Sequence, residues 1–224
     1  MPKSLRDLEA QLERVRGETS EVQIDIVDGM FAKNTTWPYK DREAFQKIIS
    51  GDEGLPLWEE FDFQFDVMAV HPEQITTDLI LAGASSIIVH AKSEGSMQAL
   101  DGLQSARKED DFPVSVGIAI LPDADAESLT PFDGLYDFIQ VMGIARIGFQ
   151  GEAFDSRALA LVRKLRETYC DTMIQVDGGV SLENVRALVD AGASRLVVGS
   201  VIFTADDSRA SIDRLRRSAN KNQV

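Results

Sequence analysis

The chain has 224 residues, 44% of them hydrophobic and 27% charged, so we expect residues 1–224 to form a single α/β domain. Its formal net charge of −14 argues against nucleic acid and anionic membranes as partners, and no segment approaches the roughly 18 apolar residues of a membrane span. The only cysteine, Cys170, excludes an internal disulfide and is expected to be buried. These features predict a cytoplasmic protein.

Short apolar runs alternate with amphipathic segments along the chain, and no low-complexity linker divides them. Ser4 and Ser181 are expected to cap the helices that follow them. In chain order the sequence predicts a helix over 4–16, a strand over 22–27, a helix over 41–49, a strand over 61–68, a helix over 72–82, a strand over 86–91, a helix over 97–108, a strand over 114–120, a helix over 123–129, a strand over 138–142, a helix over 156–168, a strand over 172–176, a helix over 182–191, a strand over 195–198 and a helix over 207–218.

Strands that alternate with helices indicate parallel pairing through right-handed crossovers, and hence a TIM (β/α)8-type barrel. Only seven strands are predicted, and a helix comes first, so the barrel lacks its first β-strand in this chain. We expect the native N-terminus to extend upstream of Met1, because an open barrel would expose unpaired strand edges. An open, doubly wound sheet is the alternative fold.

Polar residues gather at the carboxyl ends of the predicted strands, where barrel enzymes carry their active sites. Asp25, Asp66, His90 and Asp177 all occupy such positions. The segment 61–66, FDFQFD, alternates strictly, so its phenylalanines would pack under helices while its polar residues point inward. Antiparallel strands with one wet face would give the same alternation, but the intervening helices argue against them.

Two glycine-containing strand ends predict a phosphate site. Gly178 and Gly179 follow one late strand, and Gly199 and Ser200 follow the next, with a short helical turn expected after Gly199. Glycines let backbone N–H groups approach an anion closely, and barrels commonly bind phosphate after their seventh and eighth strands. The alternative is that these glycines serve only as turns.

Several segments carry a family likeness. Residues 23–29, QIDIVDG, with Phe31 and Asn34, look like the signature His-Leu-Asp-(Ile/Val)-Met-Asp-Gly-x-Phe-x-x-Asn. Residues 66–70 stand where that family has His-Leu-Met-Val, and residues 82–90 match its Ala-Gly-Ala…His strand. Residues 141–142 with 148–154 resemble its Val-Met-Ser-Val-Asn-Pro-Gly-Phe-Gly-Gly-Gln loop with one extra residue, and residues 176–180 and 198–203 match its later strand ends closely. Over nearly its whole length the chain therefore resembles the ribulose-phosphate 3-epimerase family.

The resemblance implies an isomerase that epimerises a pentulose or other ketose phosphate by two-carboxylate proton transfer through a metal-stabilised enediolate. By position Asp25 and Asp177 match the acid/base pair. Gln23 and Asp66 stand where the family has two metal-binding histidines, so the metal set becomes Gln23, Asp25, Asp66 and Asp177. These oxygen ligands favour Mg²⁺ or Mn²⁺ over Zn²⁺.

The likeness also implies the remaining site. Gly151 joins the phosphate-binding glycines, and the predicted substrate pocket contains Met68, His90, Met142 and Arg146. Arg146 either reaches the substrate phosphate or forms a surface salt bridge. The expected partners are a small phosphorylated sugar and further copies of the chain, since the family forms oligomers. The alternative functions are a sugar-phosphate-binding barrel with lost or altered chemistry, and an assembly subunit that merely keeps the fold.

Overall fold

The computed structural model describes residues 1–109, 114–149 and 151–220, which fall into two compact units. The first unit comprises residues 1–118 and 132–137, and the second comprises residues 119–131 and 138–224. Within the described residues, no helix is both long enough and apolar enough to cross a membrane.

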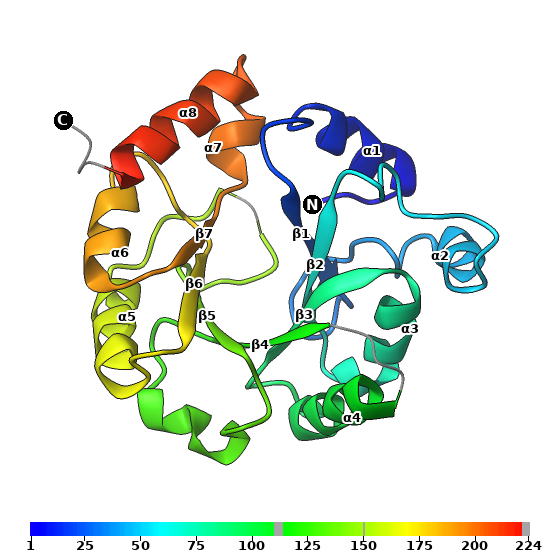
Figure 1. The fold of residues 1–224 in the computed structure, drawn as a ribbon, viewed down its shortest axis with the longest axis horizontal. Coiled ribbons are helices and arrows are strands. Elements are labelled where there is room, and N and C mark those ends of the chain that lie inside the picture. Colours follow the sequence, from blue (N-terminus) through cyan, green and yellow to red (C-terminus); the bar gives the residue numbers. More distant parts are fainter. Residues whose placement is uncertain (110–113, 150, 221–224) are drawn as a thin grey trace. The chain divides into compact units, whose positions relative to one another are not determined.

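The first unit begins with a helix and continues with parallel strands. Its elements are α1 (Leu5–Glu13), β1 (Glu21–Val27), α2 (Arg42–Ile49), β2 (Asp62–Met68), the 3-10 helix η1 (Pro72–Gln74), α3 (Thr76–Leu81), β3 (Ala84–His90), α4 (Ser96–Glu109) and most of β4 (Ser115–Ile120). Helices α2, α3 and α4 lie on one side of strands β1 to β3 (Figure 1). Ser4 caps α1 as predicted, accepting a hydrogen bond from the backbone N–H of Asp7.

The register of β1, β2 and β3 determines which side chains lie side by side. β1 pairs with β2 and β2 with β3, both in parallel. Gln23 is opposite Gln64, and two residues further on Asp25 is opposite Asp66. Parallel pairing contradicts the alternative of antiparallel strands with one wet face.

Both faces of β2 are buried, although its sequence alternates between apolar and polar residues. Phe63 and Phe65 are buried on one face, and Gln64 and Asp66 are buried on the other. Gln64 is satisfied there by donating a hydrogen bond from Nε2 to Oγ of Ser86, at 3.2 Å. The alternation thus reflects an apolar layer under the helices and a hydrogen-bonded polar layer opposite it.

The second unit contains the later strands and helices. Its elements are most of the 3-10 helix η2 (Ala126–Phe132), β5 (Phe138–Met142), α5 (Arg157–Thr168), β6 (Met173–Asp177), α6 (Val185–Ala191), β7 (Arg195–Val197), α7 (Ser200–Phe203) and α8 (Ser208–Ala219). β5, β6 and β7 pair in parallel, with Gln140 opposite Gln175 and Met142 opposite Asp177. Helices α5 and α6 lie on one side of these strands (Figure 1).

Three predicted helices differ from the observed ones. The expected helix over 72–82 is interrupted at Ile75, where a run of β-branched residues disfavours helix and the buried Ile75 side chain packs in the core. The short helix expected over 123–129 is instead the 3-10 helix η2, which contains Pro131. The helix expected over 182–191 begins only at Val185, with Asn184 at its N-cap, because residues 182–184 form a turn.

Cys170 is exposed, so the prediction of a buried thiol was wrong. It lies between α5 and β6, where the chain turns at the surface. The two tryptophans contrast with each other: Trp37 is fully buried against Phe45 and Phe65, whereas 64% of Trp58 is exposed.

Candidate functional site

Two carboxylates meet at the carboxyl ends of β1 and β2. Asp25 and Asp66 occupy paired positions, and each offers an oxygen within 4.8 Å of the other. Asp66 is fully buried, while Asp25 is half-buried. Two like charges at this separation repel each other strongly when little water screens them.

The surroundings of Asp25 disfavour its charged form. Burial, followed by repulsion from Asp66, raises the pKa of Asp25 to about 6. A hydrogen bond of 3.1 Å from Nε2 of Gln23 to Oδ1 of Asp25 acts in the opposite direction. A carboxyl group with a pKa near 6 can both accept and release a proton near neutral pH.

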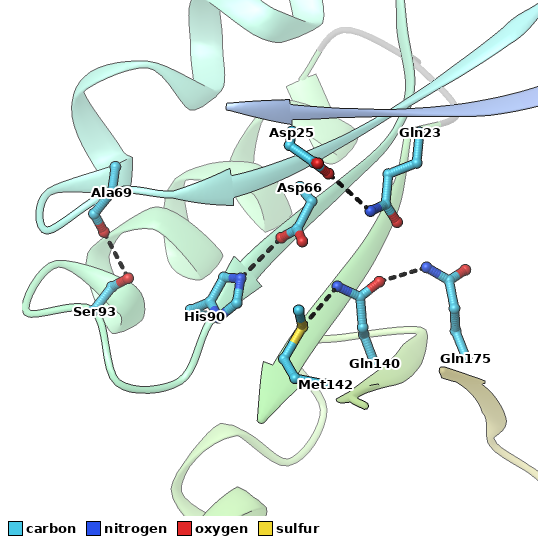
Figure 2. Close-up of polar contacts among 9 residues, drawn as sticks. All are labelled: Gln23, Asp25, Asp66, Ala69, His90, Ser93, Gln140, Met142 and Gln175. Atoms are coloured by element: carbon cyan, nitrogen blue, oxygen red, sulfur yellow. Dashed lines mark hydrogen bonds and ion pairs between the residues drawn. The ribbon is translucent and has the colours of Figure 1, made fainter. Parts of the chain in front are cut away.

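His90, at the end of β3, is paired with Asp66. Its Nε2 lies 2.9 Å from Oδ1 of Asp66, and both side chains are buried (Figure 2). The ring of Phe31 packs edge-on against the imidazole, with 5.2 Å between centroids. The sequence pattern places His90 and Asp66 at strand ends but does not predict that they interact.

Hydrogen bonds fasten the loops around this part of the first unit. Asp28 accepts bonds from the backbone N–H groups of Met30 and Phe31 through Oδ1, and from that of Val70 through Oδ2. Ser93 donates from Oγ to the carbonyl oxygen of Ala69 at 2.7 Å (Figure 2). The segment after β2 is therefore held by the loop after β1 and by the loop after β3.

The second unit carries the glycine-rich strand end. Asp177 is the last residue of β6, and Gly178 and Gly179 follow it with φ values of +103° and +66°. A Cβ at Gly179 would lie 2.8 Å from Cα of Phe154. Left-handed backbone and close approach of another segment both require glycine here.

The end of β7 leads directly into a short helix, as predicted. Gly199 is the N-cap of α7, and Ser200 is its first residue. The backbone N–H groups of Ile202 and Phe203 bond to the carbonyl oxygen of Gly199, at 3.0 Å each. Both glycine-containing strand ends therefore exist, while their role in phosphate binding stays a prediction.

A ladder of polar side chains crosses β5, β6 and β7. Nε2 of Gln175 donates to Oε1 of Gln140 at 2.5 Å, and Nε2 of Gln140 donates to the sulfur of Met142 at 3.4 Å (Figure 2). Arg195 donates to Oε1 of Gln175 at 3.4 Å. Arg195 was not predicted as part of the site, since a single arginine in a short apolar strand gives no distinctive signal.

Arg146 lies at the surface, where 74% of its side chain is exposed. It forms an ion pair with Glu152 at 2.7 Å, and its guanidinium lies over the ring of Phe149. Of its two predicted roles, the surface salt bridge is the one present in this structure. Gly151 follows in the same loop with a φ of +77°, and Gln150 lies outside the described residues.

The remaining predicted pocket residues are buried at strand ends. Met68 is the last residue of β2 and Met142 is the last residue of β5, and both side chains are buried. Both are thioethers, which adapt readily to the shape of a neighbouring group.

The carboxylate pair of the first unit fits a hard divalent cation. Asp25 and Asp66 offer oxygen ligands, and a cation between them would relieve the repulsion that raises the pKa of Asp25. Gln23 turns its amide nitrogen toward Asp25, so its contribution would come from the amide oxygen. Carboxylate and amide oxygens suit Mg²⁺ or Mn²⁺ better than Zn²⁺.

Solved structures define the fold class. The chain superposes on a crystal structure of 3-hexulose-6-phosphate synthase with a TM-score of 0.67 and 19% identity, covering 96% of this chain and 95% of that one. It superposes on a crystal structure of KGPDC from Streptococcus mutans with a TM-score of 0.71 and 10% identity, covering 98% and 94%. These matches confirm the predicted (β/α)8-type barrel over the doubly wound alternative, with seven strands among the described residues.

The sequence model of the Ribulose-phosphate 3 epimerase family matches residues 2–203, and the chain belongs to that family. The ribulose-phosphate 3-epimerase of Schizosaccharomyces pombe is 29% identical over 202 residues, which cover 90% of this chain and 83% of the relative. That of Aquifex aeolicus is 27% identical over 208 residues, covering 90% and 86%. Membership of this family supports a sugar-phosphate epimerase function.

Proposed function

We propose that this chain is an isomerase that epimerises a ketose phosphate at the carbon next to its keto group. The observation that carries the proposal is the close pair of Asp25 and Asp66 at the carboxyl ends of β1 and β2, in which burial and the second carboxylate raise the pKa of Asp25. A group that inverts a stereocentre must take a proton at near-neutral pH, and an ordinary exposed aspartate is too weak a base for this.

The proton transfers are assigned to two carboxylates. Asp25 removes the proton from one face of the carbon, and Asp177 delivers a proton to the opposite face. Asp177 receives this role from its place in the family motif, at the end of β6. Inversion by two bases requires a proton donor on each side of the reacting carbon, and for the reverse reaction the two residues exchange roles.

A divalent ion would be held by Gln23, Asp25, Asp66 and Asp177, with Mg²⁺ or Mn²⁺ favoured. When bound, it would supply positive charge next to the oxygens on which negative charge develops. The support for this part of the proposal is the close pair of Asp25 and Asp66 together with family membership.

The substrate phosphate would bind to backbone N–H groups at the two glycine-containing strand ends. We assign this role to Gly178, Gly179, Gly199, Ser200 and Gly151. At Gly178 and Gly179, the positive φ orients the backbone so that its N–H groups can converge on an anion.

The pocket would be completed by Met68, His90, Met142 and Arg146. For Arg146 this requires that its guanidinium leave Glu152 when the phosphorylated sugar binds. We further propose that the protein works in the cytoplasm as a homo-oligomer.

The direct test is turnover of ribulose 5-phosphate with Mg²⁺ or Mn²⁺, followed in heavy water. Epimerisation yields xylulose 5-phosphate and places deuterium on the inverted carbon. Asp25→Asn, which keeps the shape of the side chain, should lower kcat by about 100- to 10,000-fold, the usual worth of a general base. Tight binding of the sugar phosphate without deuterium exchange, with either metal, would overturn the proposal. It would favour the second candidate, a sugar-phosphate-binding protein with lost chemistry, which is suggested by Gln23 and Asp66 in place of the family's two histidines.

A further inference from the structure

The side chain of His90 is hydrogen-bonded to a proposed metal ligand. Its Nε2 lies 2.9 Å from Oδ1 of Asp66, and 2% of the His90 side chain and none of the Asp66 side chain is exposed. A buried carboxylate needs donors to offset its lost hydration, and His90 provides one in the tautomer that carries its proton on Nε2. The bond also turns Oδ1 of Asp66 toward the end of β3.

The ring and the backbone of His90 are each held in place by a neighbour. Phe31 packs edge-on against it, and the position of Phe31 is fixed by its backbone N–H bond to Oδ1 of Asp28 at 2.8 Å. The backbone of His90 is held separately, because its carbonyl oxygen accepts a bond from the N–H of Ser93 at 3.0 Å. The contact with Phe31 and the bond to Asp66 both restrict rotation of the ring.

The backbone that carries Asp66 is fixed as well. Ser93 bonds to the carbonyl oxygen of Ala69, and Asp28 bonds to the N–H of Val70, so two neighbouring loops hold the residues just after β2. The side-chain torsion of Asp66 is in turn restrained by its hydrogen bond to His90. Aspartate has a shorter side chain than the histidine it replaces, so the orientation of Asp66 decides whether its oxygen reaches the metal ion.

We infer that His90 is a positioning residue, which orients the Asp66 carboxylate toward Asp25 and acts on substrate or metal only through Asp66. The inference rests on the proposed function, in which Asp66 is a ligand of the divalent ion. It refines the proposed place of His90 in the pocket, since the contact assigned to its imidazole is with Asp66. Removing a residue that hydrogen-bonds to a metal ligand typically lowers metal affinity or activity by roughly 10- to 100-fold.

Binding of Mn²⁺ to the purified protein, together with turnover, provides the first test. His90→Leu should weaken Mn²⁺ binding by roughly 10- to 100-fold and lower kcat by a similar factor, with the KM for the sugar phosphate little changed. His90→Gln, which keeps an N–H donor at a similar reach, should recover most of the loss. His71→Gln is the matched control, since His71 is half exposed and pairs with Glu73 instead.

Proton NMR of the histidine rings provides the second test and is independent of activity. The chain has two histidines, and His71→Gln assigns the remaining signals to His90. We expect a slowly exchanging proton on Nε2 of His90 whose chemical shift changes in Asp66→Asn. Absence of that proton, or a shift that ignores Asp66→Asn, would refute the pairing.

The failures of the two proposals are distinguishable. If the native protein turns over no sugar phosphate, the proposed function fails, while the NMR signal and Mn²⁺ binding still decide the role of His90. If turnover is normal and His90→Leu changes neither Mn²⁺ affinity nor kcat, the positioning role alone is wrong. A large rise in KM with unchanged Mn²⁺ affinity would instead assign His90 to direct substrate contact.

Discussion

The raised pKa of Asp25 suits proton transfer but lowers the stability of the folded protein at neutral pH. Its pKa is raised from 3.8 to about 6, first by burial and then by Asp66. Because the folded pKa lies above the unfolded one, the folded state holds the proton more tightly. The stabilisation present below about pH 4 is therefore lost as pH rises through about 6, by up to about 3 kcal/mol for a shift of this size.

This linkage predicts how Asp25→Asn changes stability. The asparagine keeps an acceptor for Gln23 but cannot ionise, so in the presence of a chelator the variant should be more stable than the native protein at about pH 8 and nearly equal to it at about pH 4. Urea denaturation at several pH values measures this. Asp101→Asn removes an exposed carboxyl from α4 and is the control. Equal stability of Asp25→Asn and native protein at about pH 8 would show that burial does not penalise this charge.

Gly179 combines left-handed backbone with a close neighbour. Alanine at a φ of +66° costs about 1–2 kcal/mol, and its Cβ would meet the backbone of Phe154 at 2.8 Å. Gly179→Ala should therefore displace the strand end or the segment at Phe154, and weaken ribulose 5-phosphate binding about tenfold or more.

A second glycine separates backbone strain from collision. Gly83 has a φ of +93°, and a Cβ added there would meet no described atom within 4 Å, so Gly83→Ala carries the strain without the collision. Calorimetric titration should show unchanged binding for Gly83→Ala. If both variants bind alike, the strand end at Gly179 does not take part in binding the phosphate.

At the scale of elements, Arg166 joins two helix ends to the strands that follow them. From α5 its guanidinium donates to the carbonyl oxygens of Cys170 at 2.6 Å and Thr172 at 2.9 Å, and to that of Gly192 at 3.0 Å. Gly192 is the C-cap of α6. One side chain thus satisfies backbone carbonyls just beyond the carboxyl ends of both helices.

Removing Arg166 should cost more stability than removing an ordinary surface arginine. Arg166→Ala leaves several carbonyl oxygens unpaired, and we expect a loss of about 2–4 kcal/mol in the free energy of unfolding. Arg157→Ala breaks an exposed pair with Asp155 and should cost less than about 1 kcal/mol. Chemical denaturation compares the two. Similar losses for both would mean that water replaces Arg166 without penalty.

The order and type of the elements follow from the sequence because each strand or helix depends mainly on local periodicity. The interruption at Ile75 and the late start of α6 do not, because tertiary packing and a turn outweigh the local preference there. The pairing of His90 with Asp66 was also beyond prediction. It depends on the register of β2 and β3, which contains an irregularity at Phe63 and Gln64 that no sequence pattern marks.

At the scale of the whole molecule, the fold class and the family were predictable, because spaced motifs over the full length constrain both. What composition adds is the net charge of −14, which repels a phosphorylated sugar from most of the surface. Binding must then depend on local backbone dipoles rather than on long-range attraction. The sequence predicts oxygen ligands at Gln23 and Asp66. How Gln23 and His90 orient the two carboxylates is visible only in the structure.

The placement of Trp37, Trp58 and Cys170 gives the protein built-in optical reporters. Both tryptophans lie in the first unit, and the only thiol, which is exposed, lies in the second. Intrinsic emission therefore follows one unit and a dye on Cys170 follows the other. For the predicted single domain, the two signals should change at the same urea concentration. Separate midpoints would mean that residues 1–224 unfold in stages.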